Sequence, residues 1–127
     1  MTNWTDEHAI EMLRGVLGLA VLIQACLFLR ATIIGMQAAR ASGGAIGAHQ
    51  WILLTLASVE IVATIMFLAP VVNIAGAYLL LAVFALAILF HFLRGEYEVS
   101  NLAVYAAITL VWLKRRQEAK ASLRNER

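Results

Sequence analysis

Apolar residues fill four long stretches of the chain, and short polar segments separate them. These stretches predict helices over about 9–29, 48–69, 73–93 and 99–113. The first helix can continue through Ala39, because the residues after 29 remain compatible with a helix. Pro70 ends the second stretch, since proline lacks a backbone donor and its ring clashes with the preceding turn. Only a short connection follows, which predicts an antiparallel hairpin.

Two polar segments complete this pattern. The sequence RASGGAIG at 40–47 is a glycine-rich loop, and RGEYEVSN at 94–101 is a hydrophilic turn before the last apolar stretch. Four connected spans predict an all-α, up-down-up-down four-helix bundle that forms a single domain in a membrane. An even number of spans places both termini on one side.

The composition supports this interpretation, because 62% of the 127 residues are hydrophobic and only 14% are charged. Acidic residues precede the first apolar stretch, which argues against a signal peptide and favours a retained span. Six of the ten basic residues lie in the tail at 114–127, so the positive-inside rule predicts cytoplasmic termini. We expect the protein in the bacterial inner (plasma) membrane. The predicted aromatic anchors are Trp4 and Trp112 at the inner interface, and Trp51 and Tyr97 at the outer one.

One acidic residue interrupts the second apolar stretch, TLASVEIVATIMFLAP. A carboxylate in the hydrocarbon region is costly unless it is protonated, paired or next to a wet cavity. The helical neighbours of Glu60 are mostly small, so another helix can approach this face closely; they are Leu56, Ala57, Ala63 and Thr64. Glu60 is therefore the first candidate for a functional residue, and it is the candidate proton acceptor.

Arg14 is the predicted partner of Glu60, because the two depths differ by roughly the reach of a long guanidinium side chain. Gly15 and Gly18 make the first helix shallow at this point. The pair is either a polar site for a proton, a quinone-like head group or another small ligand, or a structural ion pair. A third alternative is a protonated Glu60 bonded to a backbone carbonyl. The ion pair predicts that Glu60→Leu, with Arg14 present, lowers stability.

A second polar set is predicted near the outer surface, where Cys26, His49 and His91 come to similar depths and Arg94 lies nearby. Cysteine and histidine are ligands for zinc and copper. None of the spacings is a metal motif, so we assign no metal site. The alternative is that the histidines are interfacial and the thiol is inert.

Other chemistry is excluded by the sequence. A single cysteine rules out an internal disulfide and a CxxC redox pair. No P-loop, GxGxxG motif, haem signature or nucleophile with a nearby base is present. The basic tail is typical of a membrane anchor and is able to contact anionic lipids or a protein partner, whereas a nucleic-acid partner is not expected.

The sequences LRGVLGLAVL and SVEIVATIMFLAPVVNIAGAYLLLAVFALAILFHFLRGE, with a short fourth stretch before a basic tail, resemble the DoxX-like family of small four-helix membrane proteins. The matching residues are Arg14, Gly15, Glu60, Pro70, Gly76 and His91. The chain departs from the family in its long segment at 30–47 and in having Arg30 where a lysine is expected.

The resemblance implies an accessory or assembly subunit that binds a quinone or lipid and associates with a membrane protein or with further copies of itself. Some relatives are subunits of quinone-linked oxidoreductases for thiosulfate or thiol oxidation, which is the enzymatic alternative. A small transporter is a third alternative, although it would be expected to contain broken helices or several facing polar residues.

Overall fold

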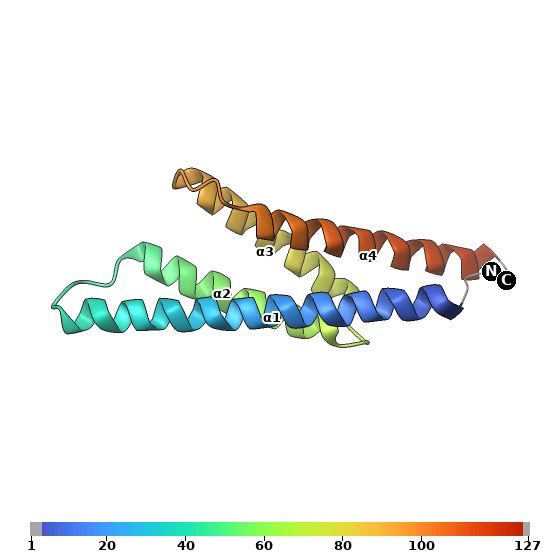
Figure 1. Ribbon diagram of the computed structural model, residues 1–127, viewed down its shortest axis with the longest axis horizontal. Helices are drawn as coiled ribbons and strands as arrows, with labels where there is room; N and C mark the ends of the chain where they lie inside the picture. The colour runs from blue at the N-terminus through green and yellow to red at the C-terminus, as the bar shows by residue number, and fades with distance from the viewer. Residues whose placement is uncertain (1–3, 126–127) are drawn as a thin grey trace.

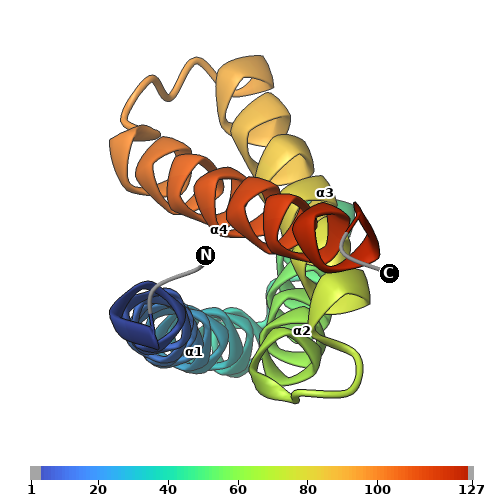
Figure 2. The ribbon, with the colours of Figure 1, turned by 90° about the vertical axis from the view of Figure 1, so that its right-hand side faces the viewer.

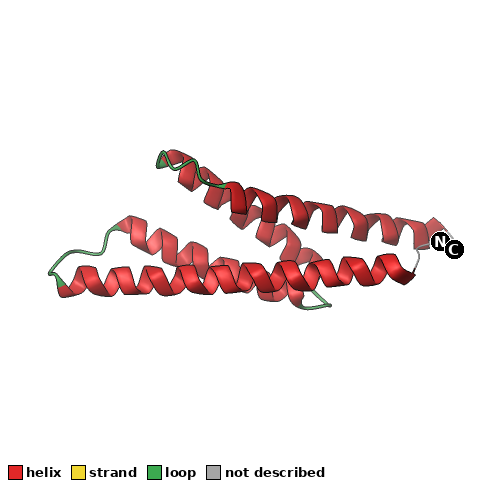
Figure 3. Ribbon diagram, viewed as in Figure 1, coloured by secondary structure: helices red, strands yellow, loops and turns green. Residues whose placement is uncertain are grey.

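The computed structural model describes residues 4–125, and these residues form an all-helical structure (Figures 1 and 3). Its four helices are α1 (Trp4–Ala41), α2 (Ala48–Leu68), α3 (Asn73–Leu93) and α4 (Ser100–Asn125). The predicted all-α class and the number of helices are therefore confirmed. Within the described residues, α1, α2 and α3 are the helices that are long and apolar enough to cross a membrane.

The hairpin of α2 and α3 matches the prediction most closely. Helix α2 ends at Leu68, and Ala69 has an extended backbone with φ −72° and ψ 125°. This conformation follows from Pro70, because the proline ring disfavours a helical backbone in the residue before it. At the other end of α3, Gly95 has φ +74°, the left-handed conformation in which glycine often ends a helix.

The first and last helices, α1 and α4, are longer than predicted. Helix α1 begins at Trp4 instead of residue 9, and α4 continues through the basic tail to Asn125. The tail contains alanine, lysine, glutamate and arginine, which favour helix even when the segment is solvated. The apolar part of α4 ends where Lys114 begins a run of charges, so this helix lacks the apolar length of the other three. Arg127 lies outside the described residues.

The four helices form a V in two arms. Figure 1 shows α1 and α2 in one arm and α3 and α4 in the other, with the arms closest beside the α2–α3 turn. Figure 2 shows the same two arms from the end at which α1 starts and α4 finishes. The arms separate toward the α1–α2 and α3–α4 connections. We call the closed end of the V its vertex.

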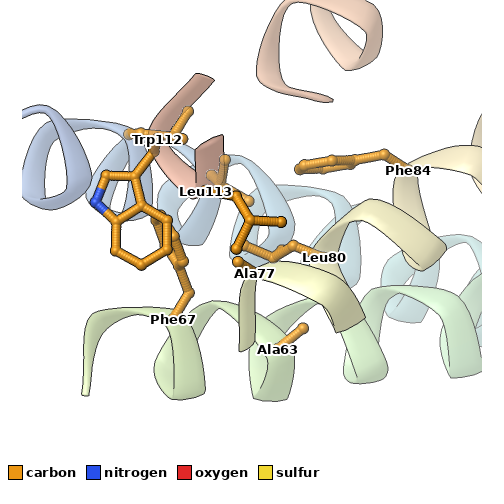
Figure 4. Close-up of a cluster of buried hydrophobic side chains, with 9 residues drawn as sticks. Ala63, Phe67, Ala77, Leu80, Phe84, Trp112 and Leu113 are labelled. Atoms are coloured by element: carbon orange, nitrogen blue, oxygen red, sulfur yellow. The ribbon is translucent and has the colours of Figure 1, made fainter. Parts of the chain in front are cut away.

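The core lies at the vertex (Figure 4). The rings of Phe67 and Trp112 meet edge to face at 4.9 Å, which joins α2 to α4. Trp112 is fully buried, so the prediction that it anchors the chain at the membrane interface is wrong. The side chain of Trp4 is outside the description, whereas Trp51 and Tyr97 are exposed, as anchors are. The core residues are Leu17, Val21, Ala63, Phe67, Ala77, Leu80, Phe84, Trp112 and Leu113.

Two glycines allow helices to approach closely, and a third does not. A Cβ at Gly76 would lie 2.6 Å from Phe67 Cα and would also overlap the neighbouring backbone, so α3 touches the backbone of α2 here. A Cβ at Gly18 would overlap the side chain of Leu68. Gly15 has nothing within 4 Å of its Cβ position, so its predicted role in helix packing is wrong.

We expect Gly76→Ala to destabilise the protein by about 1–3 kcal/mol, because the new methyl group must displace backbone atoms of α2. Gly15→Ala is the matched control, and it should be neutral or stabilising by up to about 1 kcal/mol, since alanine favours a helix interior. Thermal unfolding in a mild detergent measures both variants. Equal stability of the two would show that the vertex contact is wrongly placed.

Candidate functional site: a buried acid beside an apolar groove

Glu60 lies in the middle of α2 on the face that packs into the protein. Ala57, Ala63, Thr64 and Phe67 share this face and are buried, and Glu60 itself is only 9% exposed. The small side chains around the acid are what allow neighbouring helices to come close. The sequence-based expectation of a buried acid in the second helix is therefore met.

The carboxyl group of Glu60 is not satisfied by the described residues. Its Oε1 atom is buried and has no hydrogen-bond partner. The hydroxyl of Thr64, one turn later, donates its hydrogen bond to the backbone carbonyl of Glu60 at 2.7 Å and not to the carboxyl group. A buried acceptor without a donor is energetically costly, by about 1–3 kcal/mol. Such a group is retained where it serves a ligand, a proton or a partner.

Arg14 does not pair with Glu60, which corrects the prediction. Its Nη2 atom lies 2.6 Å from Glu11 Oε2, one turn earlier on the same helix. Its Nη1 atom donates to the backbone carbonyl of Phe67 at 3.5 Å. This carbonyl is among the last four of α2, which lack partners within the helix. Arg14 therefore caps the C-terminal end of α2 and does not reach Glu60 in the middle of this helix.

The separation explains why the predicted pair does not form. Glu60 lies two turns beyond Phe67 along α2, which corresponds to about 10 Å. Glu11 also competes for the guanidinium at the i, i+3 spacing that brings side chains together on a helix. That spacing is visible in the sequence, so the true partner of Arg14 was detectable there.

Glu11 links two arginines from different helices. Its second oxygen lies 3.6 Å from Arg116 Nη1, which joins α1 to α4. The Nε atoms of Arg14 and Arg116 and the indole nitrogen of Trp112 are buried without acceptors. Figure 4 shows that indole nitrogen at the edge of the core, on the side away from Phe84. The contact between Glu11 and Arg116 is not visible in the sequence, because the two residues are far apart along the chain and only the packing of α1 against α4 brings them together.

The residues of the second predicted polar set, Cys26, His49 and His91, have separate surroundings. Cys26 is exposed on α1 and lines a shallow hollow with other residues of the same helix. His91 is bonded to its own helix, with Nδ1 3.1 Å from the Ala87 carbonyl. His49 instead stacks on Phe90, with 5.7 Å between the ring centroids. Among residues 6–125, no three histidine, cysteine or acidic side chains gather closely enough to hold a metal ion.

A hollow of about 510 Å³ lies between α2 and α3, in the open half of the V. Its wall is almost entirely apolar. Helix α2 contributes Trp51, Ile52, Thr55, Leu56 and Val59, and helix α3 contributes Val83, Leu86, Leu89, Phe90 and Leu93. We call this hollow the α2–α3 groove. This groove is not visible in the sequence, because its lining residues are of the same kinds as those of any lipid-facing helix surface.

The inner end of the α2–α3 groove lies beside Glu60. Phe67 of α2 and Gly76 of α3 are in contact. Glu60 is seven residues before Phe67, and Val83, which lines the groove, is seven residues after Gly76. Because the two helices are antiparallel, Glu60 and Val83 lie at the same level. Val59 precedes the acid, and Leu56 is about 40° from it around the helix. Glu60 is not part of the groove wall, whereas Leu56, one turn before it, is.

Comparisons of the chain with family models, curated proteins and solved structures give no match. The resemblance to the DoxX-like family therefore stays a prediction. What the structure establishes is a small helical membrane protein with three helices suited to spanning a bilayer. The buried acid and the adjacent groove are the features from which a function is inferred.

Glu11→Gln should destabilise the protein by about 1–3 kcal/mol, because it leaves Arg14, whose side chain is only 14% exposed, without its carboxylate. The matched control is Glu118→Gln, which breaks an exposed pair with Lys114 at 4.0 Å and should cost less than about 0.5 kcal/mol. Thermal unfolding in detergent compares them. If Glu11→Gln is as stable as the control, Glu11 does not hold the three helices together.

Proposed function

We propose that this chain is an accessory or assembly subunit in a membrane, and that it binds a quinone or lipid between α2 and α3. The observation that carries the proposal is the buried Oε1 atom of Glu60, which has no hydrogen-bond partner among the described residues. Glu60 lies at the level of the inner end of the α2–α3 groove. A lipophilic molecule with a polar head group would supply a hydrogen-bond partner for Glu60 and apolar contacts for the groove wall. Its chain fills the α2–α3 groove, and its head group exchanges a hydrogen bond with the acid.

Displacement of Leu56 connects the groove with the acid in this proposal. Leu56 lines the groove and is one helical turn from Glu60, so a change of its side-chain rotamer would open a way from the groove to the acid. The ligand head group then lies at mid-depth in the bilayer, where a neutral ring is tolerated and a charged group is not. This geometry supports a quinone head group at Glu60 and a hydrocarbon chain toward the outer surface.

The enzymatic alternative assigns Glu60 the role of proton acceptor beside a quinone, in a subunit of a quinone-linked oxidoreductase. The same buried oxygen favours it. A redox partner would have to come from another chain, because Cys26 is exposed on α1 and has no cysteine to pair with. The transporter alternative has no such support, since α2 and α3 run unbroken through their apolar lengths.

Glu60→Leu should lower binding of a short-chain quinone, such as decylubiquinone, by about tenfold, which is the value of one buried hydrogen bond. The same variant should be as stable as the natural protein or more stable by up to about 2 kcal/mol, because no arginine depends on the acid. This reverses the expectation from an Arg14–Glu60 pair. Quinone titration of the purified protein measures binding, and thermal unfolding measures stability.

The matched control is Ser58→Ala, two residues before the acid. The Ser58 hydroxyl is exposed and bonds the carbonyl of Leu54 in its own helix, so the variant should bind quinone normally. Glu60→Gln retains a hydrogen-bonding side chain and should keep most of the affinity. Unchanged binding by Glu60→Leu would overturn the proposed role of the acid.

We also propose that both termini face the cytoplasm. The start of α1 and the end of α4 lie at the same end of the molecule (Figure 1), and that end holds most of the basic residues. Alkaline phosphatase fused after the last residue should be inactive, because it folds only outside the cytoplasm. The same enzyme inserted in the loop at 42–47 should be active. The opposite result would invert the orientation.

A further inference from the structure

The outer mouth of the α2–α3 groove carries a cation and an imidazole. Phe90 lines the groove, and the Arg94 guanidinium carbon lies 5.8 Å from the centre of its ring. The ring of His49 stacks on the same Phe90 at 5.7 Å. Two polar side chains, one from α2 and one from the C-cap of α3, therefore each contact the aromatic ring that forms the rim. Trp51, an aromatic residue suited to the membrane interface, lines the groove at the same end.

Below this rim the lining changes sharply in polarity. From Phe90 to Val83 and from Trp51 to Val59 the groove is bordered by apolar side chains, with the Thr55 hydroxyl bonded to its own helix at 2.9 Å. These segments correspond to about 10–12 Å of helix. Half of a bilayer hydrocarbon core is about 15 Å. The groove thus extends from the interface through most of one leaflet.

The charge at the rim is only partly neutralised. Arg94 Nη2 lies 3.3 Å from Glu96 Oε1, and both side chains are more than two-fifths exposed. A guanidinium has five N–H donors, so one carboxylate oxygen leaves capacity for a phosphate. An imidazole contributes a further N–H donor in either tautomer. The rim is suited to an anion, and Glu96 competes for the same cation.

We propose that the α2–α3 groove holds one acyl chain of an anionic glycerophospholipid whose phosphate binds Arg94 and His49. The inference rests on one part of the proposed function, that a lipophile occupies the α2–α3 groove. It selects the lipid over the quinone, and it places the head group at the outer rim instead of at Glu60. Charge complementarity decides between the candidates: a neutral quinone brings no charge to Arg94, whereas the lipid matches both the rim and the leaflet-long apolar wall. Glu60 then lies beyond the end of the acyl chain.

The test is native mass spectrometry of the full chain released from vesicles made of equal parts phosphatidylglycerol and phosphatidylcholine with identical acyl chains. The expected result is one retained phospholipid, with about a fivefold preference for phosphatidylglycerol, the effect of one basic residue near the surface. Arg94→Gln should remove the preference for phosphatidylglycerol without lowering the amount of lipid retained. Glu96→Gln should increase this preference, because Glu96 competes with the phosphate for Arg94. Lys120→Gln, an exposed charge at the opposite end, should change nothing.

A second pair of variants tests the groove itself. Thr55→Trp fills the groove and should lower retention of both lipids about equally. Its matched control is Ser58→Trp, because Ser58 is also exposed on α2 and also bonded to its own helix, but does not line the groove. The control should retain lipid as the natural protein does.

The outcomes separate the inference from the proposed function. Equal retention of the two lipids, or a preference that survives Arg94→Gln, overturns the phosphate site and leaves a lipophile in the groove. If Thr55→Trp retains as much lipid as Ser58→Trp, no lipophile occupies the groove and both proposals fail.

Discussion

The contact between Gly76 and the backbone of Phe67 is the constraint on which the arrangement depends. It brings α3 against α2 just after the turn at Pro70, so it fixes both the closest point and the register of the two helices. Everything further along follows from that register. Glu60 comes level with Val83, and the two helices reach their outer ends at Trp51 and Phe90 with a groove between them.

The partly buried Arg14 and the buried Glu60 have different surroundings. Arg14 is near the vertex and is compensated by a carboxylate and by the carbonyl of Phe67, so it binds three helices together through Glu11 and Arg116. Glu60 is closer to the centre of α2 and has no such compensation. A structural role suits the first charge. The second costs stability without holding helices, which is the pattern expected of a residue kept for binding or chemistry.

The sequence predicted the elements well and their contacts poorly. Apolar runs and Pro70 located α2 and α3 almost to the residue, because span length and helix breaking are local properties. The predicted pairing of Arg14 with Glu60 is wrong because depth alone does not determine which face of a helix a side chain occupies, and because Glu11 lies closer, one turn away on the same helix. The depths of Cys26, His49 and His91 likewise agreed while their directions did not.

The groove itself could not be predicted from hydropathy, although side-chain size explains it. Near the vertex, α2 and α3 meet through Ala63, Gly76 and Ala77, whereas toward the outer end they carry larger side chains such as Trp51 and Phe90. In a bilayer, helices associate through close packing rather than through exclusion of water. Small residues therefore close one end and bulky ones separate the other. The walls of the α2–α3 groove lack dispersion contacts with each other, and the hydrocarbon chain that we propose would supply such contacts.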